Sequence, residues 1–232
     1  MQQIQGDGFT VTVKKSNRRK TTALTIKRGE VFVHIPTRLP IVIAQQFIKE
    51  KTAWIKQKLE QQSLRMPMER DFINGEVLLF LGEKHTLQLV EKSAPVSVLK
   101  NEQNINVHGR LNRLSKAAIR AAIILWFKHQ AAEYLSHRTH QLSIKTGLKP
   151  KSITIKTYKA RWGSCGIHGD IQFNWKLMLA PPEIIDYVII HELCHIKQHN
   201  HSAAFWHLVE QHYPYYIMSR NWLKYNGYNL NI

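Results

Sequence analysis

Hydrophobic and polar residues alternate in short runs over most of the first hundred positions, a pattern typical of β-strands. The strands expected from this alternation are residues 9–13, 22–26, 31–35, 77–81, 86–90 and 104–108. Between the third and fourth of them, apolar residues recur at i, i+3, i+4 spacing over residues 41–64, which predicts one amphipathic helix. Residues 1–110 are therefore expected to form a β-rich part that contains a single amphipathic helix.

The second half of the chain has a different pattern. Residues 114–142 predict a long helix, with Ala118, Ala121, Ala122, Leu125 and Tyr134 on its buried face. Residues 153–158 and 171–179 alternate as strands, and the second follows a glycine turn, which indicates a hairpin with residues 161–166. A helix over residues 183–198 is apolar nearly all round and is expected to be buried, and a further helix is expected over residues 202–210. We therefore expect an α+β protein, in which the basic β-rich part packs on a helical core with a β-hairpin, residues 111–232.

Composition narrows the class of protein. With 44% hydrophobic residues in 232, the chain can bury an ordinary core. No apolar run reaches 18 residues, so no membrane span is expected, and the first residues lack the pattern of a secretory signal. Two cysteines, Cys165 and Cys194, cannot form a disulfide framework, which favours the reducing cytoplasm.

The formal net charge of +17 is unevenly distributed. Residues 1–150 hold 25 Lys+Arg and 11 Asp+Glu, whereas residues 151–232 hold 8 and 5. Cations are densest between Asp7 and Glu30, where no acidic residue occurs. Two interpretations stay open: solvated charges that protect strand edges, or a surface that binds the phosphates of nucleic acid.

Polar residues in the buried helix carry the candidate chemistry. His191 and His195 are four residues apart, so both imidazoles can reach one metal ion from the same face of a helix. Glu192 lies about 100° around the helix, where it can contact a water on that ion without being a ligand. Two histidines and a carboxylate in an apolar helix would be costly without such a partner. The spacing therefore predicts a Zn²⁺ site with Glu192 as general base.

A catalytic zinc ion commonly has three protein ligands. His199 on a continued helix would lie about 12 Å along the axis from the first histidine, which is too far. If the chain turns at Asn200, a residue suited to a left-handed conformation, His201 becomes the third ligand. Glu210 is the alternative, followed by His207. Phe205, Trp206 and Val209 are expected to pack below the site.

The sequence resembles the YgjP-like family of zinc metallopeptidases, which is related to the SprT-like and WLM metalloproteases. The segments that carry the resemblance are Arg161-Trp162-Gly163-Ser164-Cys165, Asn174-Trp175-Lys176-Leu177, Ala180-Pro181-Pro182, Ile185-Asp186-Tyr187-Val188, His191-Glu192-Leu193-Cys194-His195, Asn200-His201-Ser202, Phe205-Trp206 and, near the start, Arg18-Arg19-Lys20 and Trp54-Ile55. The resemblance implies a zincin-like core in residues 111–232. It also implies His191, His195 and His201 as ligands and Glu192 as base.

The expected function is hydrolysis of a peptide or protein by a zinc metallopeptidase, with the strand near Trp162 or Phe173 pairing with the substrate. Tyr213, Tyr216 and Arg220 are candidates for stabilising an oxyanion. Two alternatives stay open. One is metal-dependent hydrolysis of a non-peptide substrate such as a nucleotide phosphoanhydride. The other is a nucleic-acid-binding protein whose structural zinc is closed by Cys165 as fourth ligand.

Overall fold

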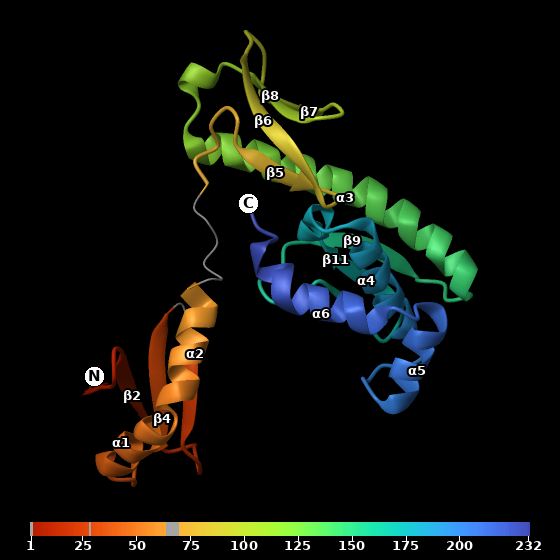
Figure 1. Cartoon of the computed structure of the whole chain (residues 1–232). Coiled ribbons are helices and arrows are strands. Elements are labelled where there is room, and N and C mark those ends of the chain that lie inside the picture. The colour runs from red at the N-terminus through yellow and green to blue at the C-terminus, as the bar shows by residue number, and fades with distance from the viewer. Residues whose placement is uncertain (1, 28, 64–69) are drawn as a thin grey trace. The chain divides into compact units, whose positions relative to one another are not determined.

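The structure is a computed structural model that describes residues 2–27, 29–63 and 70–232, and its chain divides into two compact units, Met1–Met68 and Glu69–Ile232 (Figure 1). We call them unit 1 and unit 2. The sequence pattern placed the boundary at 110/111, whereas the strands between Val77 and Gly109 belong to unit 2, because they bury apolar side chains against its long helix. Within the described residues, no helix is both long and apolar enough to cross a membrane.

Unit 1 is a four-stranded sheet with helices on one face. Its strands are β1 (Gln3–Gln5), β2 (Thr10–Ser16), β3 (Ala23–Lys27) and β4 (Glu30–Pro36), in the order β1-β2-β4-β3. β2 and β4 are parallel, and the other pairs are antiparallel. Alternate residues of β2 and β4 pack against helices α1 (Ile41–Glu50) and α2 (Thr52–Ser63). The single helix predicted over residues 41–64 is wrong, because Lys51 ends α1, and Leu64 lies outside the described residues.

Unit 2 begins with a second four-stranded sheet. Its strands are β5 (Val77–Phe80), β6 (Glu83–Glu91), β7 (Ser97–Lys100) and β8 (Asn104–Gly109), in the order β5-β6-β8-β7. β6 and β8 are parallel and the other pairs antiparallel, so strand order and directions repeat those of unit 1. The hydrophobic pattern along the chain does not reveal this repeat, because topology is set by which strands pair and not by their composition.

A short 3₁₀ turn, η1 (Leu111–Arg113), leads into the long helix α3 (Lys116–Thr146). Ser115 caps its start by accepting a hydrogen bond from the Ala118 amide, and Gly147 ends it with a φ of 71°, which glycine adopts without strain. The predicted buried face of α3 is wrong, since Leu125 is 70% exposed. The buried stripe instead runs at four-residue spacing through Ile119, Ile123, Phe127, Ala131, Leu135, Thr139 and Ser143, with Leu142 buried beside it.

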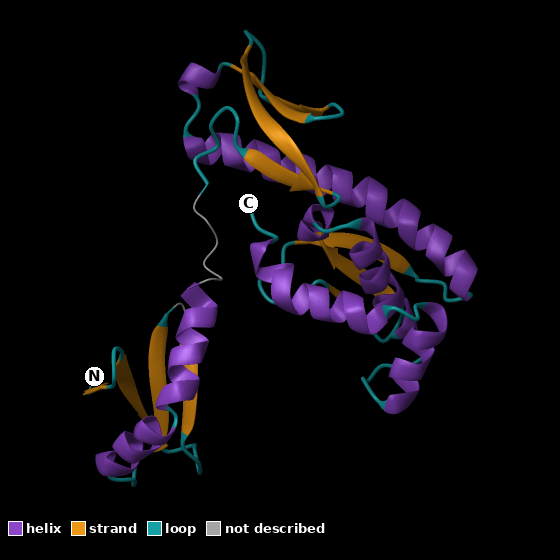
Figure 2. Cartoon of the chain, viewed as in Figure 1, coloured by secondary structure: helices purple, strands orange, loops and turns teal. Residues whose placement is uncertain are grey.

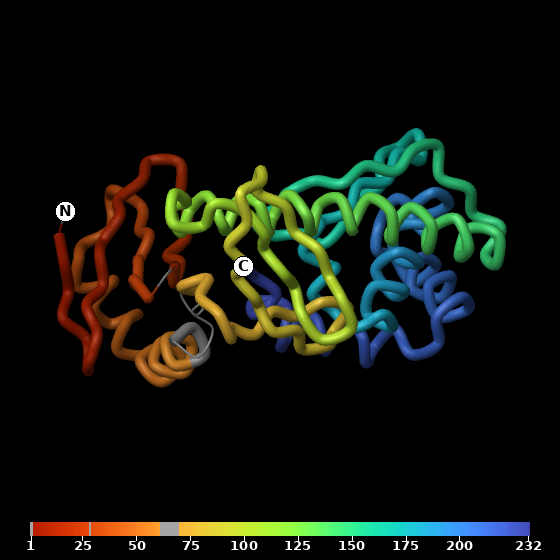
Figure 3. Tube along the Cα trace, turned by 90° about the horizontal axis from the view of Figure 1, so that it is seen from above, coloured from red at the N-terminus to blue at the C-terminus, as the bar shows by residue number. Residues whose placement is uncertain are grey.

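Helix α3 lies between the β5–β8 sheet and a smaller sheet, and β6 crosses it in both views (Figures 1 and 3). The smaller sheet contains β9 (Ser152–Lys156), β10 (Gly163–Cys165) and β11 (Asp170–Asn174), in the order β10-β11-β9. β10 is an edge strand, antiparallel to β11. The strand predicted to continue to residue 179 is wrong after Asn174, whose side chain accepts from the Lys176 amide and starts the 3₁₀ helix η2 (Trp175–Leu179).

The rest of unit 2 is helical: α4 (Pro182–Cys194), α5 (Ala203–His212), α6 (Tyr216–Asn226) and the turn η3 (Gly227–Asn229) (Figure 2). Helix α4 is buried on nearly all sides, as predicted. Arg138 on α3 holds it by donating twice to Asp186, at 2.7 and 2.6 Å. The α+β class is confirmed, while helix α6 was not predicted.

Candidate metal centre

The chain reverses direction directly after α4. The predicted helix to residue 198 is too long, because α4 ends at Cys194 and His195 caps it. The amides of Lys197 and Gln198 both donate to the Cys194 carbonyl, which closes a tight turn. Asn200 does not adopt the predicted left-handed conformation, since the reversal is completed before it; its side chain accepts from the Ser202 amide at 3.2 Å.

This turn brings three imidazoles together. His191, His195 and His201 each offer one ring nitrogen that could bind a metal ion, and these three nitrogens all lie within 4.8 Å of one another. His191 Nε2 and His201 Nε2 are 3.1 Å apart. Two ligands of a tetrahedral zinc ion with bonds of about 2.0–2.1 Å lie about 3.3 Å apart, so this spacing fits a shared ion.

An aromatic floor fixes the three rings. Phe205 of α5, which is fully buried, stacks on His195 with ring centroids 4.4 Å apart and contacts His191 and His201 edge-on at 4.9 and 4.8 Å. Trp206 packs beside His201 at 5.6 Å. The predicted packing role of these two aromatic residues agrees with these contacts, which restrict the rotamers of the imidazoles before any ion binds.

A second layer of contacts selects the nitrogen that faces the site. His195 Nδ1 lies 2.9 Å from the Gln198 carbonyl oxygen, to which it donates as the N–H tautomer. That tautomer leaves Nε2 of His195 with a lone pair for a metal ion. His191 Nδ1 is buried and has no hydrogen-bond partner among the described residues.

Glu192 lies against the backbone of β10. Its side chain is 6% exposed, and a Cβ built on Gly163 would lie only 2.6 Å from Glu192 Oε1. Only a glycine leaves room for the carboxylate there. This role of Gly163 could not be predicted, because nothing local in the sequence shows which backbone faces a given helix.

Burial shifts the pKa of the carboxyl group and of an imidazole in the site. It raises the pKa of Glu192 to about 8, an effect opposed by the positive charge of Arg161. It lowers the pKa of His191 to about 3, to which the charges of His195, His201 and Arg220 contribute. The imidazole is thus held neutral, the form that binds a metal ion.

The alternative ligands lie elsewhere. Glu210, His207 and Cys165 do not belong to this group of converging ligand atoms, and His199 lines the cavity without joining it. The Cys165 thiol instead donates to the Gly166 carbonyl at 3.4 Å, and burial, with Glu192 and Asp170 nearby, raises its pKa to about 11. Among the described residues, the group therefore consists of the three histidines alone.

Two cavities meet at Glu192 and His191. The first, of about 320 Å³, lies over the histidines and is lined by Arg161, Gly163, Ser164, Cys165, His191, Glu192, His195, His199 and His201. The second, of about 360 Å³, extends toward α6 and is lined by Arg161, Trp162, Gly163, Tyr187, Val188, His191, Glu192, Arg220, Leu223 and Lys224. A substrate bound across both cavities would pass the candidate general base.

The YgjP-like metallopeptidase domain matches residues 20–226, most of the chain and both units. The chain belongs to the YgjP-like metallopeptidase family. The family resemblance seen in the sequence is thereby confirmed, and with it a metallopeptidase as the class of protein. Comparison with curated proteins found no match. The crystal structure of the metallopeptidase zymogen abylysin from Pyrococcus abyssi is 22% identical, over 39% of this chain and 93% of that one, with a TM-score of 0.34.

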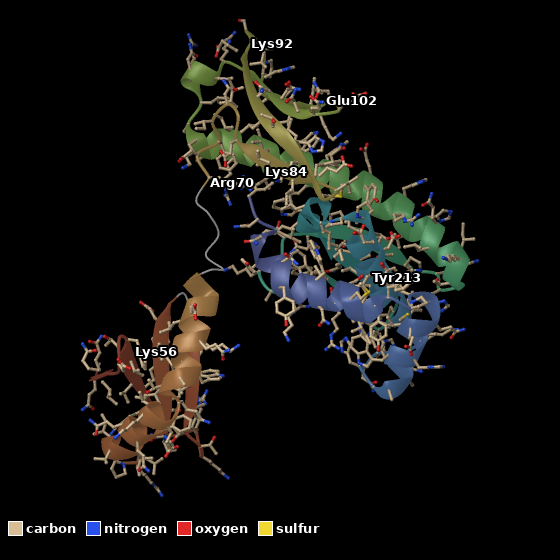
Figure 4. All side chains as sticks on the ribbon, in the orientation of Figure 1. Lys56, Arg70, Lys84, Lys92, Glu102 and Tyr213 are labelled. Atoms are coloured by element: carbon tan, nitrogen blue, oxygen red, sulfur yellow. The ribbon has the colours of Figure 1, made fainter. Side chains whose placement is uncertain are left out.

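The three oxyanion candidates have different surroundings. Tyr213, which caps the end of α5, donates its hydroxyl to the Glu183 carbonyl of α4 at 2.8 Å. This hydrogen bond connects the two helices and is therefore structural; Tyr213 is labelled in Figure 4. Tyr216 stacks on Trp206, with ring centroids 5.4 Å apart. Arg220 alone of the three lines the cavity beside Glu192.

Proposed function

We propose that this YgjP-like protein is a zinc-dependent peptidase, in which His191, His195 and His201 hold the ion and Glu192 is the general base. The observation that carries the proposal is the convergence of three imidazole nitrogens beside a buried carboxylate. An all-histidine set favours zinc over magnesium or calcium, which prefer oxygen ligands. When bound, the ion supplies a Lewis acid and lowers the pKa of water toward 7.

The residues of the chain perform the proton transfers. Glu192, held against Gly163, accepts a proton from the attacking water at a carboxylate oxygen and delivers it to the nitrogen of the leaving amine. Its raised pKa suits the second step, and a cation at the histidines favours the ionised form that the first step needs. Among the described strands, β10 has a neighbour on one side only, and its other edge, next to Glu192, can pair with an extended peptide backbone.

The test compares the zinc-loaded wild type with Glu192→Gln. We expect about one zinc per chain in both proteins by metal analysis, and hydrolysis in a peptide and protein panel by the wild type alone. Hydrolysis that survives in Glu192→Gln would contradict the assignment of Glu192 as the general base. A nucleotide panel run alongside tests the phosphoanhydride alternative, and zinc in a closed four-ligand site without any hydrolysis would support a structural role.

We also propose that unit 1 binds single-stranded nucleic acid on the face of its sheet that the helices leave uncovered. Phe32 and His34 lie on this face of β4, and the Lys14 ammonium sits 4.1 Å from the centroid of the Phe32 ring. Burial and the charges of Arg19, Lys14 and Lys27 lower the pKa of His34, so these cations gather around it. An aromatic ring among cations suits base stacking combined with phosphate binding.

The experiment is fluorescence anisotropy with a labelled single-stranded oligonucleotide. Affinity should fall by about 10³ between 50 and 200 mM salt if six or more phosphates are contacted. Lys14→Gln and Phe32→Leu should weaken binding, while Lys49→Gln, on a helix that covers the opposite face, serves as the control. A flat salt response, or equal losses in all three variants, would contradict this proposal.

A further inference from the structure

The cavity between α4 and α6 carries positive charge that is not ion-paired within the described residues. Arg161, Arg220 and Lys224 all line it, and among the described residues Glu192 is the only acidic one that does. Within the described part of the chain, none of these three cations has a carboxylate within 4.0 Å. Arg161 is the cation whose charge acts on Glu192, and neither cation on α6 forms an ion pair with a described carboxylate.

The position of Arg220 is fixed by an aromatic ring. Its guanidinium lies over Trp206 at 4.6 Å from the ring centroid, and Trp206 is in turn stacked on Tyr216. A guanidinium that stacks by its plane keeps its edge N–H groups available for a carboxylate. Lys224 is four residues further along α6, so both cations project from the same face of that helix.

The other walls of the cavity are apolar. Trp162, Val188 and Leu223 contribute side chains, and the Tyr187 ring lies on the α4 side. The Trp162 ring packs so closely on Gly227 that a Cβ at this glycine would come within 2.9 Å of the ring. This close packing holds Trp162 in place. A cavity of about 360 Å³ with apolar walls and two cations fits one residue with a hydrocarbon stem and an anionic end.

We propose that this cavity is a subsite that binds a carboxylate of the substrate next to the scissile bond, through Arg220 and Lys224. The inference rests on the proposed peptidase function and names its substrate class. The carboxylate can come from an acidic side chain or from the C-terminus of a peptide. Two donors on one helix face match the two oxygens of a carboxylate, whereas a single oxyanion would need only one of them.

The experiment uses the full-length zinc-loaded chain and matched pairs of quenched fluorescent peptides. One pair differs only by Glu or Gln at a single position, scanned on both sides of the cleaved bond. The other pair differs by a free or an amidated C-terminus. The first pair reports an acidic side chain and the second a terminal carboxylate. We expect one carboxylate member to be preferred by about tenfold or more in kcat/KM.

Substitution assigns that preference to the cavity. Arg220→Gln and Lys224→Gln should each reduce it, and the double variant should abolish it. Lys128→Gln, which removes an exposed cation on α3, should leave it unchanged. Lys224 is an exposed residue that lines the cavity, so its variant keeps the test decisive if Arg220→Gln does not fold. Equal use of acid and amide peptides, or a preference that persists in the double variant, would overturn the proposal.

A binding measurement separates this inference from the proposed function. The same peptides, labelled for anisotropy, are titrated into zinc-loaded Glu192→Gln, where no turnover is needed. A carboxylate preference in binding without any hydrolysis by the wild type would support the subsite and refute the peptidase. Hydrolysis without any carboxylate preference would support the peptidase function and refute the subsite.

Discussion

Replacing Gly163 by alanine should disable the general base without touching the metal ligands. An ideal Cβ at this position would lie 2.6 Å from Oε1, 2.7 Å from Cγ and 2.8 Å from Cδ of Glu192. Ordinary van der Waals contact begins at 3.4 Å, so the carboxylate or strand β10 must move by about 0.8 Å, the difference between 3.4 and 2.6 Å. The three atoms nearest to the new methyl group all belong to Glu192.

A displacement of that size is large for a catalytic group. Misplacing a reacting group by about 1 Å costs on the order of 100-fold in rate, which is about 2.7 kcal/mol of transition-state stabilisation. We therefore expect kcat/KM of Gly163→Ala to fall about 100-fold. Zinc content should stay at the wild-type value, because the histidines are not displaced.

The assay measures kcat/KM on one peptide, with zinc content and a thermal melt for each variant. Gly166→Ala is the matched control, because its Cβ would meet the Asp170 carbonyl at 3.6 Å, an ordinary contact. The double variant with Glu192→Gln should be no slower than Glu192→Gln alone, since both changes act on one group. Wild-type kcat/KM in a folded, zinc-loaded Gly163→Ala protein would refute the reasoning.

Three further predictions test other parts of the structure. His201→Ala should weaken zinc binding by at least about 100-fold in a chelator competition, whereas His199→Ala, in the same cavity but outside the histidine group, should change it little. Arg138→Ala should lower the free energy of unfolding in urea by about 1–2 kcal/mol, because it removes a partly buried bidentate pair with Asp186. Bound single-stranded DNA should raise the pKa of His34 in an NMR titration, since phosphates offset the cations that, with burial, now lower it; an unchanged pKa would argue against this face.

The candidate site could be predicted where its pattern is local. His191, Glu192 and His195 share one helix, whose period alone places them together. His201 was predicted from a distance, because on a continued helix His199 would lie too far from His191 to share an ion with it. The structure brings His201 next to the other two histidines, and its role as a ligand stays a prediction. The turn predicted at Asn200 is wrong, because the Cys194 carbonyl accepts two backbone hydrogen bonds and the chain reverses earlier.

Features that depend on distant parts of the chain could not be predicted. Gly163 and Glu192 are 29 positions apart, and only the packing of α4 against β10 shows that they touch. Helix α6 could not be predicted, because Tyr216–Asn226 mixes polar and aromatic residues and has only Ser219 in the buried class. The division at Lys51 was hidden because an apolar stripe continues from α1 into α2.

The distribution of charge has a different meaning in each unit. Residues 151–232 are nearly balanced, with 8 cations and 5 acids, yet Arg161, Arg220 and Lys224 gather in one cavity. In unit 1, the charges of Lys14, Arg19 and Lys27 instead gather around His34 on an open sheet face. Exposed charges are screened over about 10 Å at 0.1 M salt, and groups in a cavity are screened less. Nucleic-acid binding by unit 1 should therefore weaken steeply in a salt titration, while the carboxylate preference of the cavity should persist to higher salt. One salt series on the full-length protein would thus assign each effect to its own surface.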